Sequence, residues 1–170
     1  ETRWTSVLQK ELGSNFEIIS EGLNGRTTVW DDPVEGEYRN GKKYLLPCLH
    51  THKPIDLVIL FLGSNDLKHR FSVTPEEVAR GVLALVNIIK KSETGPNMQS
   101  PKILVLIPPH VKALPSFDAI YLEAVEKSKL FPKFFKEILN KMCHLLDIST
   151  IIESSDIDGT HLDPKNHALL

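Results

Sequence analysis

The alternation of short apolar runs with helical patterns most constrains how this chain of 170 residues folds. Runs that are apolar at nearly every position are typical of strands covered on both faces, as in a parallel sheet. Four such runs predict strands at Phe16–Ser20, Ile55–Leu62, Lys102–Ile107 and His144–Ile148. Strands that alternate with helices favour a doubly wound α/β domain, in which ligands bind at the carboxyl ends of the strands.

Helical patterns fill the intervals between these runs. Arg3–Leu12 carries apolar residues at helical spacing, and Thr74–Glu77 combines a cap, a proline and two acidic residues, which predict a helix start. A further helical region covers Phe117–Met142, where Pro132 is expected to break or kink the helix. The polar segments expected to be loops are Asp31–Tyr44 and Ser92–Pro101.

Size and composition indicate a single domain over residues 1–170. The net charge of −2 gives no electrostatic footprint for nucleic acid or an anionic membrane. No apolar run approaches the roughly 18 residues of a membrane-spanning helix. Cys48 and Cys143 form neither a CxxC pair nor a disulfide framework, which favours a reducing compartment such as the cytoplasm. We therefore expect neither nucleic acid nor a membrane as a partner.

The turn after the second predicted strand, Gly63-Ser64-Asn65-Asp66, places polar groups at the rim of the sheet. Glycine permits a sharp turn there. The side-chain amide of Asn65 is a donor suited to a developing oxyanion, a role worth about 3 kcal/mol in a transition state. The alternative is a simple turn, since these residue types are the commonest in turns.

The loop after the first predicted strand, Glu21–Thr28, contains two glycines. Gly22 and Gly25 allow another backbone or a ligand to approach closely, and the N–H of Gly25 is a second candidate oxyanion donor. The spacing lacks the GxGxxG fingerprint of dinucleotide sites. In the alternative interpretation this is a strand-to-helix loop in which Arg26 makes a structural ion pair.

A carboxylate and an imidazole lie three residues apart in Asp158-Gly159-Thr160-His161, close to the C-terminus. An imidazole acts as a general base when a neighbouring group fixes its tautomer and offsets its charge. A carboxylate on the same tight loop can do both. The alternative is a loop aspartate beside a surface or helix-capping histidine, because DxxH alone has little specificity.

Other histidines and one tryptophan are weaker candidates. His50 and His52 could share a face of an extended segment and bind a metal, but no third ligand at a suitable spacing is evident, so no metal site is predicted. His110 follows the third strand and is expected to line the cleft, whereas His167 is expected on a helix surface. Trp30 either walls a substrate pocket or packs under a loop.

Taken in order, EGLNGRTT, LGSND and DGTH resemble the motifs of the SGNH (GDSL-type) hydrolases. The resemblance is closer to the arylesterase and acyltransferase branch. It is carried by RWTSVLQKELGSNFEIISEGLNGRTTVWDDP, PIDLVILFLGSND, KILVLIPP and IDGTHL, which are distributed from Arg3 to Leu162 and so span most of the chain. It implies a flavodoxin-like three-layer sandwich and a lipase-like serine hydrolase that cleaves esters through a Ser-His-Asp triad, without a cofactor.

The resemblance also implies roles for individual residues. His161 would be the general base and Asp158 its orienting partner. The N–H of Gly25 and the side chain of Asn65 would form the oxyanion hole. The nucleophile of the family lies in a GDS segment on the first strand, which would precede Glu1.

Serines within the chain fit the nucleophile role poorly. Ser64 would compete with Asn65 for orientation, Ser20 ends a strand, and neither lies in a Gly-x-Ser-x-Gly elbow. In a flavodoxin-like sheet the first strand is internal, so its removal would leave two neighbouring strands with unpaired backbone groups. We therefore expect the sequence to be part of a longer protein and incomplete at both ends.

The function expected is a serine ester hydrolase for small acyl esters, with acyl transfer to an alcohol as a second outcome of the same acyl-enzyme. A small-molecule ester is then the expected partner, and the sequence is compatible with a homo-oligomer. A catalytically inactive protein of SGNH fold that binds a carbohydrate, an acylated ligand or a protein is the main alternative. A flavodoxin-like nucleotide binder is less supported, because no phosphate-cradling run precedes a capped helix.

Overall fold

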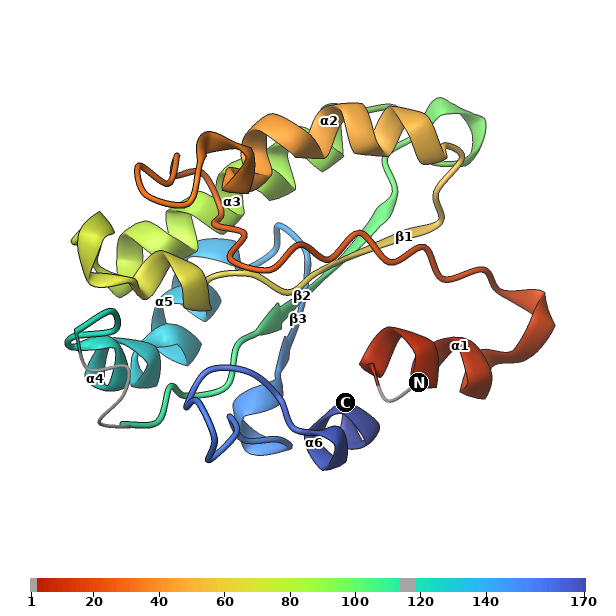
Figure 1. Ribbon diagram of the computed structural model, residues 1–170. Coiled ribbons are helices and arrows are strands. Elements are labelled where there is room, and N and C mark those ends of the chain that lie inside the picture. The colour runs from red at the N-terminus through yellow and green to blue at the C-terminus, as the bar shows by residue number, and fades with distance from the viewer. Residues whose placement is uncertain (1–2, 114–118) are drawn as a thin grey trace.

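Three parallel strands form the sheet of the computed structural model, which describes residues 3–113 and 119–170. The strands are β1 (Leu57–Leu60), β2 (Lys102–Ile107) and β3 (His144–Asp147), in the spatial order β1-β2-β3 (Figure 1). Leu60 of β1 is in register with Val105 of β2, and both strand pairs are parallel, so the carboxyl ends gather at one edge. The predicted parallel α/β architecture is confirmed.

Six α-helices surround the sheet in the described part of the chain. They are α1 (Trp4–Leu12), α2 (Gly41–His52), α3 (Pro75–Lys91), α4 (Ala124–Lys129), α5 (Phe131–Leu139) and α6 (Pro164–Leu169). On one side of the sheet α3 packs against α2 and α5, whereas α1 packs against α6 on the other side (Figure 1). Helices therefore cover both faces, as in the expected three-layer sandwich.

Side chains of β2 alternate between two apolar cores. Val105 and Ile107 pack into the larger core with Phe131 of α5. Leu106 points to the opposite face and packs into a smaller core with Ile148. Because successive strand residues face opposite sides, a strand covered on both faces must be apolar throughout. This explains why β2 was predicted with its observed bounds.

The start of α3 follows the sequence signal at Thr74–Glu77. The hydroxyl of Thr74 accepts the N–H of Glu77 at 3.2 Å, and the Glu77 carboxylate accepts the N–H of Thr74 at 2.7 Å. This reciprocal capping box satisfies two donors that a helix start would otherwise leave free.

The predicted strand Phe16–Ser20 is absent from the sheet. These residues are extended, and they run in the same direction as β1 in Figure 1, but no described segment pairs with them. The side chains of Phe16 and Ile19 are 58% and 46% exposed. A strand requires a second backbone at about 4.8 Å, so the apolar pattern alone does not create one.

The predicted loop Asp31–Tyr44 is wrong at its C-terminal end, because α2 begins at Gly41. The side chain of Asn40 caps the helix and accepts the N–H of Lys42 at 2.9 Å. Asparagine is among the strongest N-cap residues, so this start was readable from the sequence. His50 and His52 consequently lie in the last turn of α2 and not on an extended segment.

The predicted helical region Phe117–Met142 is two helices, α4 and α5, over its described residues; positions 117 and 118 lie outside them. The expected break is present, because α4 ends at Lys129 and α5 begins at Phe131. Pro132 lies in the first turn of α5, where its missing N–H costs nothing. None of the helices in the described part of the chain combines the length and apolar character that a membrane crossing requires.

His167 lies on α6, as expected, but it contacts another helix. Its Nδ1 accepts the N–H of Trp4 at 3.3 Å, which joins α6 to α1. Burial lowers the pKa of His167, so the neutral ring that this hydrogen bond requires is favoured.

Candidate active site

Asp158 holds His161 in place through its two carboxylate oxygens. Oδ2 lies 2.8 Å from Nδ1 of His161, while Oδ1 accepts the backbone N–H groups of Thr160 at 3.0 Å and His161 at 2.8 Å. Gly159 between them has a φ of 71°. One carboxylate therefore shapes the tight loop and orients the imidazole at the same time.

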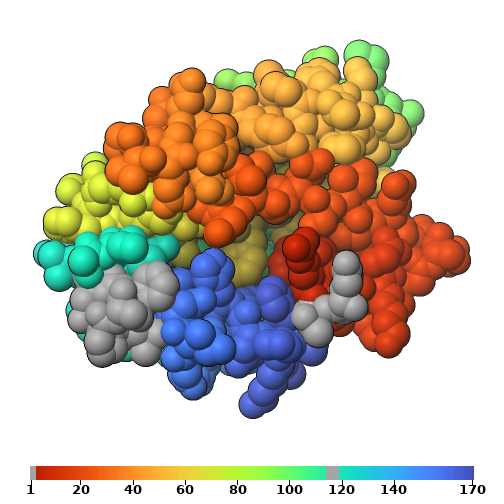
Figure 2. Space-filling model, viewed as in Figure 1, coloured from red at the N-terminus to blue at the C-terminus, as the bar shows by residue number. Residues whose placement is uncertain are grey.

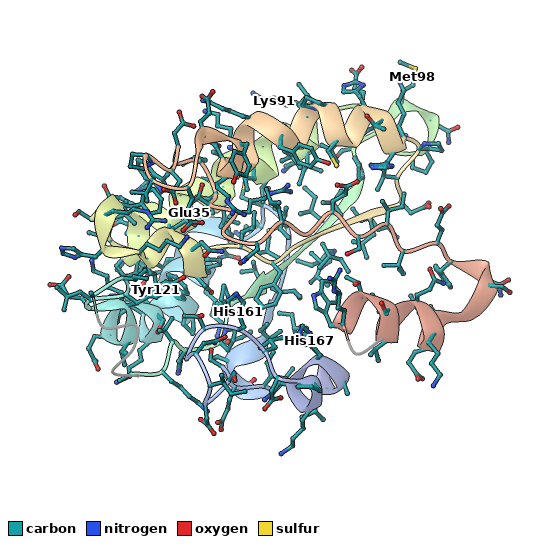
Figure 3. All side chains as sticks on the ribbon, viewed as in Figure 1. Glu35, Lys91, Met98, Tyr121, His161 and His167 are labelled. Carbon is teal, nitrogen blue, oxygen red and sulfur yellow. The ribbon has the colours of Figure 1, made fainter. Side chains whose placement is uncertain are left out.

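The electrostatics of this pair suit a general base. Partial burial acts to raise the pKa of Asp158, but hydrogen bonds from His161 and Thr160 outweigh it and hold the pKa below its usual value. The carboxylate is therefore ionised at neutral pH and accepts a hydrogen bond from the protonated Nδ1 of His161. The Nε2 of His161 bonds to no residue within 3–113 or 119–170, and the side chain is 65% exposed. In Figure 3 His161 extends from its loop toward the middle of the molecule.

Backbone hydrogen bonds fix this loop against the segment that follows β2. The N–H of Lys112 donates to the carbonyl of Gly159 at 2.9 Å, and the N–H of Ser155 donates to the carbonyl of His161 at 2.7 Å. The hydroxyl of Ser154 donates to the carbonyl of His110 at 2.8 Å. His161 is thereby anchored near the carboxyl end of the sheet.

Asn65 lies in a short helical turn, Ser64–Leu67, directly after β1. Gly63 before it has a φ of 129°, a conformation that glycine adopts at little cost. The hydroxyl of Tyr121 donates to Oδ1 of Asn65 at 3.3 Å. Within the described residues Nδ2 of Asn65 makes no hydrogen bond, so this amide has an oriented oxygen and an available donor.

Gly25 presents a second available donor. Its backbone is buried and has a φ of 73°, and its N–H donates to no acceptor in the described part of the chain. A Cβ at this position would lie 2.6 Å from a carboxylate oxygen of Glu35. The positive φ therefore favours glycine here, and a larger residue would also have to displace the Glu35 side chain.

Asp66 joins the loop of Gly25 to the turn of Asn65. The N–H of Thr28 donates to both oxygens of Asp66 at 3.1 Å, and the hydroxyl of Thr28 bonds to the same carboxylate. Asp66 is fully buried, and burial raises its pKa to about 7 although the hydrogen bonds from Thr28 act to lower it. The two segments that carry the candidate oxyanion donors are therefore joined by hydrogen bonds to one buried carboxylate.

Comparisons with known proteins were made by sequence and by structure. No protein-family model matches the sequence, and no curated protein matches it significantly. Solved structures do match, among them the aryl esterase of M. smegmatis and a carbohydrate acetylesterase from Sinorhizobium meliloti. Each is 36% identical to this chain, has a TM-score of 0.93, and is matched over 99% of this chain and 80% of its own length. The chain belongs to the SGNH hydrolase family.

Part of the site of this SGNH hydrolase was not foreseen from its sequence. Lys68 and Arg70 contact Glu35 at 2.6 and 2.5 Å, and Arg70 also contacts the buried carboxylate of Asp32 at 2.5 Å. These pairs lie more than 30 positions apart, so no local spacing reveals them. Glu35 of this network lies next to Gly25, because a Cβ built at Gly25 would be 2.6 Å from its carboxylate oxygen.

Tyr121 was also missed as a site residue of the SGNH hydrolase. Burial raises its pKa to about 12, and the negative charges of Glu35, Asp158 and Asp66 act in the same direction while Arg70 opposes them. Tyr121 therefore stays protonated at neutral pH, and its hydroxyl donates a hydrogen bond to Oδ1 of Asn65. Figure 3 labels Tyr121 together with Glu35 and His161.

The two predicted pocket residues have different environments. Trp30 is half-buried and packs against the larger apolar core, and its indole nitrogen is buried without a partner among the described residues. His110 is exposed, and its backbone carbonyl accepts the hydroxyl of Ser154.

Proposed function

We propose that this SGNH hydrolase is a serine ester hydrolase for small acyl esters, with His161 as general base and Asp158 as its orienting partner. The 2.8 Å contact between Asp158 and His161, which leaves Nε2 available, carries the proposal. The N–H of Gly25 and the Nδ2 of Asn65 would hold the oxyanion, which is supported by both donors lacking any other acceptor among the described residues. Its structural neighbours are an aryl esterase and a carbohydrate acetylesterase, which supports an esterase at the general level.

A strand of the same protein that precedes Glu1 would supply the nucleophilic serine. Among the described residues β1 pairs only with β2, so its outer edge is unpaired, and the extended residues 16–20 are unpaired as well. Figure 2 shows the surface hollowed between the orange-red N-terminal segment and the blue loop before α6. A strand in this hollow would pair with both backbones, and the loop of His161 borders the same hollow.

With that serine in place, the proposed reaction has two halves, acylation and deacylation. The serine Oγ attacks the ester carbonyl, and Nε2 of His161 takes its proton. The tetrahedral oxyanion accepts hydrogen bonds from Gly25 and Asn65, and the imidazolium returns the proton to the leaving alcohol. Water, activated by the same imidazole, releases the acid from the acyl-enzyme. An alcohol bound in place of this water would receive the acyl group instead.

Replacement of the general base tests the proposal. In the full-length protein His161→Ala is expected to lower the kcat for a small aryl acetate by at least about 10³-fold, because the variant lacks the proposed general base. His144→Ala is the matched control, since His144 is exposed at the amino end of β3, and it should keep wild-type activity. Undiminished hydrolysis by the His161 variant would refute the assignment.

A further inference from the structure

A second polar cluster lies where α2 crosses the extended N-terminal segment. Glu21 follows this segment, and its Oε1 lies 2.7 Å from Nε2 of His52. The hydroxyl of Tyr44 donates to the other carboxylate oxygen at 2.6 Å. One ligand atom each from Glu21, Cys48 and His52 lies within 4.8 Å of the others. We propose that these three residues bind a divalent transition-metal ion of the zinc class.

The helix brings two of the three ligands together. Cys48 and His52 are four positions apart on α2, so their side chains lie on the same face, one turn apart. Glu21 reaches this face from a different segment of the chain. The sequence suggested His52 as a ligand but paired it with His50, which is exposed and lies outside the cluster.

The donor set has the chemistry of a zinc site. Zn²⁺ binds thiolate at about 2.3 Å and imidazole or carboxylate at about 2.0–2.2 Å, usually with four tetrahedral ligands. Tetrahedral ligands at these lengths are about 3.5 Å apart, whereas the three ligand atoms lie within 4.8 Å of one another, so the cluster needs to contract by at most about 1.3 Å. Three protein ligands and one water would complete the coordination. The water position is open because Glu21 and His52 are 37% and 28% exposed.

Charge supports a cation at this position. The Glu21 carboxylate is the acidic group of the cluster, and it lies 2.7 Å from Nε2 of His52. Cysteine binds a metal as the thiolate, and the proton that Cys48 loses on binding would go to solvent. The thiolate and carboxylate then balance the 2+ charge. Arg26 is the nearby opposing charge, and it is held over the ring of Tyr44 at 4.4 Å and by the carbonyl of Glu21 at 2.9 Å.

The bound metal would act as a clamp. It would tie α2 to the segment that leads from Glu21 into the loop of Gly25, and it would replace the hydrogen bond between Glu21 and His52. This role is independent of the proposed ester hydrolysis, because none of the three ligands belongs to the candidate active site.

The test uses the full-length protein, freed of metal with a chelator. Titration with Zn²⁺ is expected to give one saturable site by calorimetry, and zinc at 100 times its Kd should raise the Tm by about 5–10 °C. Co²⁺ in the same site should give a thiolate-to-cobalt charge-transfer band. Cys48→Ser should abolish that band and weaken binding at least about tenfold. The matched controls His50→Ala and Cys143→Ser should bind like the wild type.

Three outcomes would overturn the proposal: no saturable site, a cobalt complex without a thiolate band, or binding that survives Cys48→Ser unchanged. Circular dichroism and the metal-free Tm establish that each variant folds. Cys48→Ser is nearly isosteric with the wild type and is therefore the decisive variant, even if replacement of His52 prevents folding. Ester hydrolysis measured on the same samples separates this result from the proposed function, because loss of metal binding is expected to leave the chemical step in place.

Discussion

Asp66 gives a quantitative test of how the two oxyanion segments are joined, through the replacement Asp66→Asn. The side chain is fully buried, and its pKa is raised from 3.8 to about 7. A carboxyl whose pKa is raised on folding binds a proton more tightly in the folded state. Its contribution to stability is therefore fully present below the unfolded pKa and is lost as pH rises through about 7.

The magnitude follows from the two pKa values. From about pH 5, two units below the folded pKa, to about pH 8, this group removes about 2 × 1.36, or roughly 3 kcal/mol, from the free energy of unfolding. Asparagine has the same shape and does not titrate, so the variant lacks this term. The wild type should lose about 5–10 °C of Tm relative to Asp66→Asn over that range.

Thermal unfolding of both full-length proteins over this pH range is the assay. His167 titrates in the same range, and its lowered pKa makes it stabilise the protein as pH rises, but this contribution is common to both proteins and cancels in the difference. Equal slopes of stability against pH in the two proteins would refute the buried, proton-binding role of Asp66.

Three further changes test the rest of the site in the full-length protein. Asp158→Asn should lower kcat by about 10⁴-fold, because the amide favours the wrong imidazole tautomer; steady-state kinetics would contradict this if kcat fell less than tenfold. Tyr121→Phe should lower kcat about 2–10-fold with KM unchanged, because the amide of Asn65 loses the 3.3 Å contact that orients it, whereas Asn65→Ala should cost about 10²-fold or more. Gly25→Ala should cost at least about 1–2 kcal/mol of stability, since its φ is 73° and the new Cβ would lie 2.6 Å from a carboxylate oxygen; an unchanged Tm would contradict the required conformation.

Features that are determined by residues close together in the sequence were predictable from it. The strand at Lys102–Ile107 was found with its observed bounds because both of its faces are covered, and α3 was found because its capping box is contained in four residues. The contact between Asp158 and His161 was also local, since a three-residue spacing on a tight loop limits where the two side chains can lie.

Features that depend on distant partners were not predictable in this way. Residues 16–20 have a strand pattern, but whether they form a strand depends on a neighbouring backbone. The contact between Tyr121 and Asn65 joins positions 56 apart, and the contact between Glu21 and His52 joins positions 31 apart. Such contacts follow from the three-dimensional arrangement of loops and helices, which no spacing rule in a single sequence specifies.

Labelling with a fluorophosphonate, followed by mass-spectrometric identification of the modified residue, tests the central proposal most directly. Only a serine activated by a neighbouring base reacts readily with such a probe. The proposed function predicts one labelled serine, on a segment of the full-length protein that precedes Glu1, and predicts that His161→Ala abolishes the labelling. Absence of labelling in the active-site-intact protein, or a label on a serine within residues 1–170, would contradict it.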